Sequence, residues 1–163
     1  MKENKFIERK AVVEKFYGAF KKLDAATMNS CYSDDIVFYD PVFGILRGAE
    51  ATCMWEMLCA TATNFSLSFD NIIDLEEGYC TCDWVATYTY LNTGKTIINK
   101  VRANMLIEDG KIIEHSDAYS IHKLSRQAYG IWGILFGWNS IFQNRIKNKA
   151  RRDLMKFMDG RSL

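Results

Sequence analysis

The sequence predicts an α+β fold in which helices cover one face of a curved antiparallel sheet. Apolar side chains recur at helical spacing in the first third of the chain, and the apolar period changes to two from about residue 65. Short turns containing glycine or asparagine join the later segments, as is typical of hairpins. Helices followed by a run of strands indicate an α+β domain, and long strands in a small sheet twist and curl until they enclose a pocket with the helices.

Three helices are expected before the long strands. The first spans residues 3–23, where apolar side chains recur on one helical face. They are Val13, Phe16, Phe20 and Leu23. Asp24 is placed to cap a second, short helix that runs to about Cys31. A third helix is expected over residues 49–63, directly after Gly48.

Five strands are expected. The first spans residues 35–40 and ends at Pro41, because proline cannot donate a ladder hydrogen bond. A loop is then expected over residues 41–47. The remaining strands are rich in Ile, Val, Thr, Tyr and Trp and form an antiparallel meander. Their expected ranges are 66–76, 79–91, 95–108 and 111–121.

The length of the chain indicates one core, to which a C-terminal tail is added. We expect a conical domain over residues 1–125, followed over residues 126–163 by an apolar segment and a basic amphipathic helix packed on it. The helix is expected over residues 139–158, where apolar side chains recur every fourth position among many Lys and Arg residues. Docking on the domain or on a second subunit and binding of a membrane surface or an acidic partner both remain open.

Bulk composition excludes several classes of function. The net charge of +1 gives no reason to expect a nucleic-acid partner, and no apolar run is long enough to span a membrane. Five cysteines without a signal peptide indicate reduced thiols and a cytoplasmic protein. Cys80 and Cys82 lack a second ligand pair, so they are expected to be small buried strand residues. We expect no metal site and no cofactor.

Two segments carry groups that could perform acid/base chemistry. Asp40 follows Ile36 and Phe38 on one side of a predicted strand, so it either caps the turn at Pro41 or lies in a pocket. In the last strand, His115, Asp117 and Tyr119 share one face. Ile113 is expected on that same face and Ile112 on the opposite one. His115 and Asp117 form either a structural pair or part of a site.

The inward faces of the helices and strands are expected to line a pocket for a small hydrophobic molecule. Such sites combine apolar walls with a few polar groups. The residues expected to bind the ligand are Phe16, Tyr17, Phe38, Trp55, Trp84, Tyr88, Asn99 and Tyr119.

The segments VVEKFYGAF and YSDDIVFYDPVFG, followed by Gly48, resemble the N-terminal half of ketosteroid isomerase in the nuclear transport factor two-like superfamily. The resemblance covers roughly residues 12–121. His115-Ser116-Asp117 and the segment RQAYG resemble a bacterial subgroup, SnoaL-like and related to ketosteroid isomerase, whose function is uncharacterised. The resemblance implies a cone-shaped fold and a homodimer formed through the outer face of the sheet. The outward residues are expected to be Val85, Leu91, Ile98, Leu106 and Ile112.

The resemblance also implies roles for single residues. Asp40 falls on the general base of ketosteroid isomerase. Of the two oxyanion donors of that enzyme, the tyrosine falls on Phe16 and the aspartate near Ala103, so both donors are lost. The arginine and aspartate of limonene epoxide hydrolase fall on Trp84 and Ala86. Asp117 resembles the acid/base aspartate of SnoaL-type cyclases. Neither steroid isomerisation nor epoxide hydrolysis by those residue sets is therefore expected.

Three hypotheses for the function follow. The first is a cofactor-independent acid/base enzyme of isomerase, cyclase, aldol or hydrolase type that acts on a hydrophobic carbonyl compound. Its catalytic residues are Asp40, Asp117 and His115. Burial raises the pKa of Asp40, Asp117 is the second acid/base group, and His115 either orients Asp117 or balances its charge. The second is a non-catalytic module that binds an apolar ligand, and the third is a structural or accessory dimer.

Overall fold

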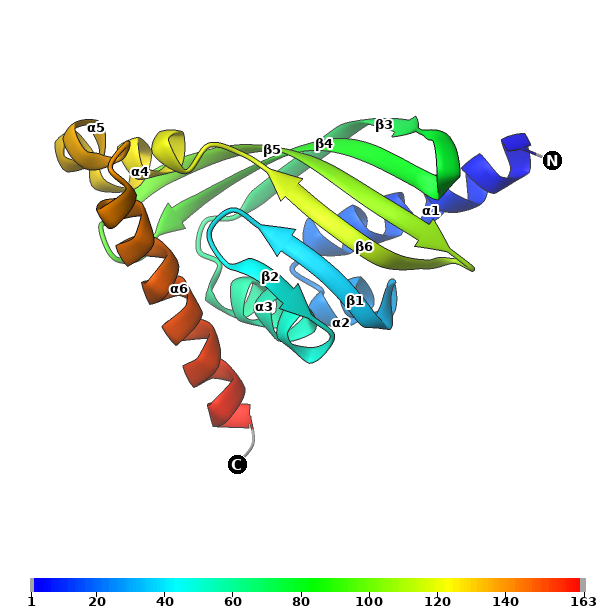
Figure 1. Cartoon of the computed structure of the whole chain (residues 1–163), viewed down its shortest axis with the longest axis horizontal. Helices are drawn as coiled ribbons and strands as arrows, with labels where there is room; N and C mark the ends of the chain where they lie inside the picture. The colour runs from blue at the N-terminus through cyan, green and yellow to red at the C-terminus, as the bar shows by residue number, and fades with distance from the viewer. Residues whose placement is uncertain (1, 162–163) are drawn as a thin grey trace.

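The sheet and its helices are arranged as the α+β prediction requires. The computed structural model describes residues 2–161 and contains one six-stranded sheet. Figure 1 shows three helices, α1, α2 and α3, on the concave face of this sheet, and three more at one end of it. The predicted fold class is confirmed.

The N-terminal helices are α1 (Lys2–Phe20), α2 (Ala25–Ser30) and α3 (Ala49–Thr61). Asp24 caps α2 as expected, because its Oδ1 accepts a hydrogen bond of 3.0 Å from the Thr27 N–H. Gly48 precedes α3 with a φ of 47° and packs closely on the backbone of Asp34. A side chain at Gly48 would be strained by this φ and would press on that carbonyl oxygen.

The strands are β1 (Tyr32–Asp40), β2 (Gly44–Arg47), β3 (Ser66–Asp74), β4 (Tyr79–Tyr90), β5 (Lys95–Glu108) and β6 (Lys111–Ala118), with a short 3₁₀ turn, η1 (Glu76–Gly78), between β3 and β4. Their order in the sheet is β2-β1-β6-β5-β4-β3. Neighbouring strands are antiparallel, except that β1 pairs with β6 in parallel. The parallel pair joins the two strands that carry Asp40 and Asp117.

The loop predicted over residues 41–47 is wrong in its second half. Residues 44–47 form β2, which folds back on β1 and pairs Asp40 with Gly44. Gly44 has a φ of 75°, which lets the chain reverse directly after Pro41. Four residues are too few for the period-two pattern by which longer strands are found.

The expected faces of the two isoleucines near the start of β6 are also wrong. Pairing between β5 and β6 shifts from Leu106 opposite Glu114 to Ile107 opposite Ile112. Ile113 is the extra residue of this β-bulge, so Ile112 turns inward and is fully buried. The predicted last strand also ends early, at Ala118.

The core lies between the inner face of the sheet and helices α1 and α3. Among its largest fully buried side chains are Phe16, Tyr17, Phe38 and Ile36. Cys80 and Cys82 are buried strand residues of this core, as predicted, and all five cysteines are free. Leu154, from the C-terminal tail, also reaches this core and is 2% exposed.

The C-terminal tail forms α4 (Ile121–Tyr129), α5 (Ile131–Phe136) and α6 (Ser140–Arg161). Helix α6 covers all but the first residue of the range 139–158 over which a helix is predicted. The division of the chain after residue 125 stays a prediction. The Gln127 side chain accepts from the Ile98 N–H and donates to the Ile98 carbonyl, at 2.7 and 3.0 Å. Strand β6 ends before it reaches Ile98, so this part of β5 has no neighbouring strand on that side. The Gln127 side chain makes the hydrogen bonds that such a strand would make.

Helix α6 runs from this end of the sheet past α3, as Figure 1 shows. Arg151 fixes it there, because its guanidinium donates to the Ile45 carbonyl of β2 at 3.0 Å and lies 3.8 Å from the Glu50 carboxylate of α3. Within residues 2–161, no helix is long and apolar enough to cross a membrane.

Candidate functional site

Asp40 and Asp117 are brought together by the parallel pairing of β1 and β6. The register sets Phe38 beside His115 and Tyr39 beside Ser116. The next position in each strand therefore carries an aspartate, and both aspartates face inward. Asp40 is 7% exposed and Asp117 is 3% exposed, so two carboxyl groups share one dry region of the protein.

The Asp40 carboxyl group has a hydrogen-bond partner on each oxygen. Its Oδ1 accepts from the backbone N–H groups of Val42 and Phe43 at 2.7 and 2.8 Å. Its Oδ2 accepts from the Tyr119 hydroxyl at 2.9 Å. Asp40 therefore caps the turn after β1 and is also buried. Its place in a ligand pocket stays a prediction.

Burial raises the pKa of Asp40 from 3.8 to about 6. Desolvation is the largest cause, and the charge of Asp117 acts in the same direction. The hydrogen bonds from Phe43, Tyr119 and Val42 stabilise the carboxylate and hold the pKa below the value that burial alone would give. Burial and the neighbouring Asp40 also raise the pKa of the Tyr119 hydroxyl well above its ordinary value.

Asp117 is the end of a chain of buried hydrogen bonds. Its Oδ1 lies 3.2 Å from His115 Nε2 and accepts from the Trp84 indole N–H at 3.4 Å. On the other side of the ring, His115 Nδ1 lies 2.7 Å from the Tyr32 hydroxyl, which accepts from the Trp55 indole N–H at 2.8 Å. Indole groups can only donate, so these two tryptophans fix the two ends of the chain.

One set of donors and acceptors fits these contacts. The Tyr32 oxygen accepts from Trp55, and its own proton can reach His115 Nδ1. In that arrangement His115 Nε2 can donate to Asp117 Oδ1. His115 therefore links Tyr32 to Asp117 through its two ring nitrogens.

Aromatic rings enclose His115. Its ring centroid lies 4.7 Å from that of Phe38, 5.5 Å from that of Phe16 and 6.2 Å from that of Trp55, and its side chain has no solvent exposure. The His115 side chain is therefore buried among aromatic rings and contacts Asp117 through Nε2. Its role in a site stays a prediction.

Four of the residues expected to bind a ligand pack on one another. Phe16, Tyr17, Phe38 and Trp55 are at most 2% exposed and belong to one core cluster. The Phe16 ring contacts the Trp55 ring edge-on at 5.5 Å, and the Phe38 ring lies 5.5 Å from Trp55 on another side. These side chains occupy space between the helices and the sheet. Their role in ligand binding stays a prediction.

The other expected binding residues lie around the carboxyl pair. Trp84 donates a hydrogen bond to Asp117, and Tyr119 donates one to Asp40. Tyr88 is half-buried, and burial together with Asp40 raises its pKa to about 12. Asn99 faces inward opposite Ala86. No hydrogen bond between described residues joins Asn99 to either carboxyl group.

An open hollow of about 410 Å³ lies where β1 and β6 end. Asp117 and Tyr119 line it, whereas Asp40 does not. Its volume is within the range of small-molecule sites. The full set of lining residues is Tyr39, Pro41, Asp117, Ala118, Tyr119, Ser120, Ile121, His122 and Gln143.

Among the residues of this region that the sequence did not reveal are Tyr32, His122 and Gln143. Tyr32 lies before the predicted start of the first strand, although the alternation that selects Ile36 would include it if continued backwards. His122 and Gln143 come from α4 and α6, and only tertiary packing brings them to the hollow. No periodic pattern in the sequence could have assigned them.

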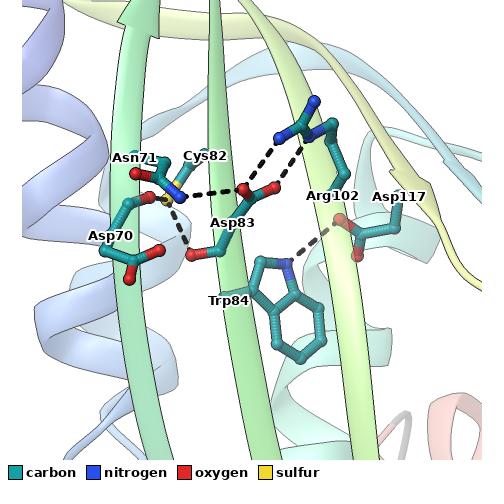
Figure 2. A network of polar contacts seen from close by, with 7 residues as sticks. All are labelled: Asp70, Asn71, Cys82, Asp83, Trp84, Arg102 and Asp117. Atoms are coloured by element: carbon teal, nitrogen blue, oxygen red, sulfur yellow. Dashed lines mark hydrogen bonds and ion pairs between the residues drawn. The ribbon is translucent and has the colours of Figure 1, made fainter.

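Adjacent residues of β4 serve opposite faces of the sheet, as Figure 2 shows. Trp84 points inward to Asp117, whereas Asp83 faces outward and accepts two hydrogen bonds from Arg102, at 2.7 and 2.8 Å. The Arg102 hydrogen bonds lower the pKa of Asp83.

A second hollow, of about 290 Å³, lies on this outer face between Val37 and Tyr79. The described residues contain no cluster of three or more His, Cys, Asp or Glu side chains suited to a metal ion.

The fold and the paired strands agree with a known family. The family model of the SnoaL-like domain matches residues 13–115, and the chain therefore belongs to this family. The match ends two residues before Asp117. No curated protein matches the chain.

Solved structures with the same fold come from several bacteria. A nuclear transport factor two-like protein of unknown function from Burkholderia pseudomallei is 16% identical with a TM-score of 0.65, and the alignment covers 76% of this chain and 98% of that one. A candidate polyketide cyclase from Xanthomonas campestris is 17% identical with a TM-score of 0.65, and the alignment covers 76% of this chain and 98% of that one. An LEH-like epoxide hydrolase from M. tuberculosis is 17% identical with a TM-score of 0.62, and the alignment covers 83% of this chain and 96% of that one. At these identities the similarity establishes the nuclear transport factor two-like fold alone.

Proposed function

We propose that this protein is a cofactor-independent acid/base enzyme, of isomerase, cyclase or hydrolase type, that acts on a small hydrophobic carbonyl compound. The observation that carries the proposal is the buried Asp40, whose pKa is about 6 and which lies beside a second buried carboxyl group. Perturbed carboxyl groups next to a hollow are common at sites of proton transfer. The candidate cyclase and the epoxide hydrolase with this fold add support for such chemistry.

Asp40 is the proton-transfer group in this mechanism. With a pKa of about 6 it is mostly ionised at neutral pH, yet it is a stronger base than an ordinary aspartate. It takes the proton from a carbon next to the substrate carbonyl, and the electron pair moves onto the carbonyl oxygen. The same carboxyl group then returns a proton to the carbon skeleton at the same or another position.

The surrounding residues orient the two carboxyl groups. Tyr119 lies between the hollow and Asp40, and its hydroxyl group holds Oδ2 at 2.9 Å. Asp117 is the second acid/base group, and His115 and Trp84 fix its Oδ1. The substrate enters through the hollow, where Tyr39 and Pro41 supply apolar surface.

Deuterium incorporation tests the proposal without knowledge of the natural product. A panel of hydrophobic ketones and 1,3-dicarbonyl compounds is incubated with the full chain in D₂O, and mass spectrometry measures exchange next to the carbonyl. Asp40→Asn should slow the exchange catalysed by the protein by about 100-fold or more, because general-base catalysis contributes at least that factor. Asp117→Asn should also slow it.

Asp35→Asn is the matched control, since Asp35 belongs to the same strand but is exposed. It should exchange at the rate of the unchanged protein. Circular dichroism of each variant checks that the fold is retained. Full exchange activity in both Asp40→Asn and Asp117→Asn would refute the proposal.

The pH profile gives a second test of the role of Asp40. The value of kcat/KM should rise as the pH passes through about 6, because the carboxylate form is the base. Tyr119→Phe removes a hydrogen bond that stabilises this form, so the midpoint should move to higher pH. A midpoint that stays in place would remove Tyr119 from the mechanism.

A non-catalytic role is the second candidate, and the packing of the interior favours it. Phe16, Tyr17, Phe38 and Trp55 occupy space between the helices and the sheet, and both oxygens of Asp40 already have partners. The protein would then bind an apolar ligand in the hollow or serve as a structural subunit. Native mass spectrometry of protein purified from its own host distinguishes the cases. A retained ligand without catalysed exchange indicates a binding protein.

We also propose a homodimer formed through the outer face of the sheet and located in the cytoplasm, where the five free thiols remain reduced. Ile98 is 49% exposed on this face, and Val85 and Leu106 are partly exposed beside it. Ile112 does not contribute, because the bulge turns it inward. Analytical ultracentrifugation should give a dimer at micromolar concentration, and Ile98→Asp should weaken it.

A further inference from the structure

The end of the molecule formed by α5 and the start of α6 exposes an unusual amount of apolar surface. We call this region, residues 131–141, the apolar tip. Seven large apolar side chains within it are at least 43% exposed, almost as many as on the rest of the described chain. They are Ile131, Trp132, Ile134, Leu135, Phe136, Trp138 and Ile141. Contiguous exposed apolar surface of this kind marks a site of interaction.

The packing of α5 on α4 forces these side chains outward. Gly133 and Gly137 are the buried residues of the apolar tip. A Cβ atom at Gly133 would overlap the backbone carbonyl of Ser125, and one at Gly137 would press on His122. Only glycine permits the two helices to approach so closely, and the bulky residues of α5 must therefore face solvent. Their exposure is a consequence of specific packing rather than of a loosely attached segment.

The tryptophans of the apolar tip present their hydrocarbon surface. The Trp138 indole N–H donates to the Leu135 carbonyl at 2.8 Å, so its polar atom is satisfied within the tip. The Trp132 ring stacks on Phe136 at 5.8 Å with an angle of 13°. Figure 1 shows α5 at the end of the molecule opposite the N-terminus, where it projects from the sheet.

Basic side chains surround the apolar tip. Residues 121–152 contain no Asp or Glu, and residues 121–163 carry nine Lys or Arg against two Asp, a net charge of +7. Since the net charge of the whole chain is +1, residues 1–120 have a net charge of −6. Lys123, Arg126 and Arg145 are exposed on α4 and α6, and the Lys95 ammonium group lies beside Gly130, next to α5.

We propose that the apolar tip docks on an anionic lipid bilayer, with its side chains inserted among the headgroups and acyl chains. Exposed tryptophans beside Lys and Arg residues suit the interface of a membrane, where ring and charge each find their preferred surroundings. The basic residues around the tip complement the negative surface of such a bilayer. The protein binds peripherally, and the conical domain stays in water.

Pairing of two copies through this surface is disfavoured by charge. A two-fold contact places the same patch on both subunits, so two basic tips would face each other. Like charges across an interface oppose association. The tip is also a projecting corner rather than a broad face, and a corner enters a lipid surface more readily than it covers a second protein.

Vesicle binding tests the inference and does not depend on any catalytic activity. The full chain is mixed with vesicles of phosphatidylglycerol and phosphatidylcholine in equal amounts, or of phosphatidylcholine alone, and sedimented. Binding to the anionic vesicles should shift the tryptophan emission to shorter wavelength. Trp132 and Trp138 report it, because Trp55 and Trp84 are buried in the core. Added salt should weaken the binding.

Two variants and one control define the surface. Trp132→Ala combined with Trp138→Ala should weaken binding at least about ten-fold, because insertion depends on apolar area. Arg145→Gln should weaken it roughly five-fold, as expected for one basic residue near an anionic surface. Ile73→Ala combined with Leu75→Ala should leave it unchanged, since these residues are 49% and 44% exposed. Ile73 pairs with the start of β4, whereas Lys95, beside α5, pairs with the end of β4.

Three outcomes would overturn the inference. In the first, the protein does not sediment with anionic vesicles. In the second, uncharged vesicles bind it equally well or the double tryptophan variant binds as tightly as the unchanged chain. In the third, sedimentation velocity reveals a dimer that the double variant dissociates, which would make a second copy the partner of the apolar tip.

Discussion

The conical domain and the apolar tip use the same kinds of residue in opposite ways. In the domain, Phe16 and Trp55 are buried between helices and sheet, and even the polar atom of Trp55 has a buried partner in Tyr32. In the tip, Trp132 and Trp138 are 61% and 71% exposed. The charges also separate, with −6 on residues 1–120 and +7 on the remainder.

The difference is determined by where the smallest residues lie. On the inner face of the sheet, the small residues Cys82, Ala86 and Ala103 leave room for aromatic rings from the helices to pack inward. Where α5 packs on α4, the positions of Gly133 and Gly137 leave no room for a side chain, and the rings of α5 lie on its other side. Apolar composition alone therefore does not indicate burial. The backbone spacing at each contact decides which way a tryptophan faces.

The largest effect is expected for a tryptophan of the domain. Trp55→Ala should lower the free energy of unfolding by about 3–5 kcal/mol, as is typical of a large aromatic residue removed from a core. The change leaves a cavity beside Phe16, Phe20 and Phe38 and removes the hydrogen bond to Tyr32. Urea denaturation measures it. A loss below 1 kcal/mol would show that the interior is looser than the ring contacts indicate.

The next effect concerns the buried charge of Asp40. The folded protein holds the Asp40 proton more tightly than the unfolded chain, because its pKa is about 6 instead of 3.8. The resulting stabilisation is fully present below pH 3.8 and is lost as the pH rises through 6. Above pH 6, the free energy of unfolding should be lower by roughly 3 kcal/mol than it would be with an ordinary aspartate pKa, because the buried group is then charged.

Asp40→Asn removes this charge and keeps an acceptor for Val42 and Phe43. As the pH rises from 4 to 7, the unchanged chain should lose unfolding free energy that the variant keeps. The variant should therefore become more stable relative to the unchanged chain over this range. Asp35→Asn, on the exposed side of β1, should give no such trend. A flat difference for Asp40→Asn would mean that the carboxylate is solvated, contrary to its burial.

A smaller effect separates two helical glycines. Gly133→Ala should destabilise the protein by about 1–3 kcal/mol, because the new methyl group forces α5 away from α4. Gly18→Ala should stabilise it by about 0.4–1 kcal/mol, since its Cβ atom would meet nothing within 4 Å and alanine favours a helix. Thermal unfolding of both variants measures the two changes. A stabilising Gly133→Ala would indicate that the packing of α5 is not specific.

Most of the fold could be predicted from the sequence because long periodic segments dominate it. The apolar residues at helical spacing in α1 and the alternation in β4 and β5 extend over many residues, and a recognisable turn follows each segment. Short or irregular features could not be predicted from these patterns. Strand β2 has four residues, and the bulge at Ile113 changes the face of Ile112 without altering the composition of β6.

The candidate site was predictable only in part, for a related reason. Asp40 and Asp117 each interrupt an apolar face, and alternation identifies such residues. Their proximity depends on the parallel pairing of β1 and β6, which no local pattern encodes. The hydroxyl group of Tyr32 and the hollow lined by His122 and Gln143 depend on tertiary contacts as well.

The smallest effect on stability is expected for the tryptophans of the apolar tip. Trp132→Ala should change the free energy of unfolding by no more than about 0.5 kcal/mol, as is usual for exposed side chains. It loses only the stacking contact with Phe136, which is itself 43% exposed. Urea denaturation beside Trp55→Ala gives the comparison within one experiment. Equal losses for the two variants would mean that Trp132 is covered in solution. A neutral result for Trp132→Ala, together with weaker vesicle binding by the double variant with Trp138→Ala, would mean that the tip serves binding and contributes little to folding.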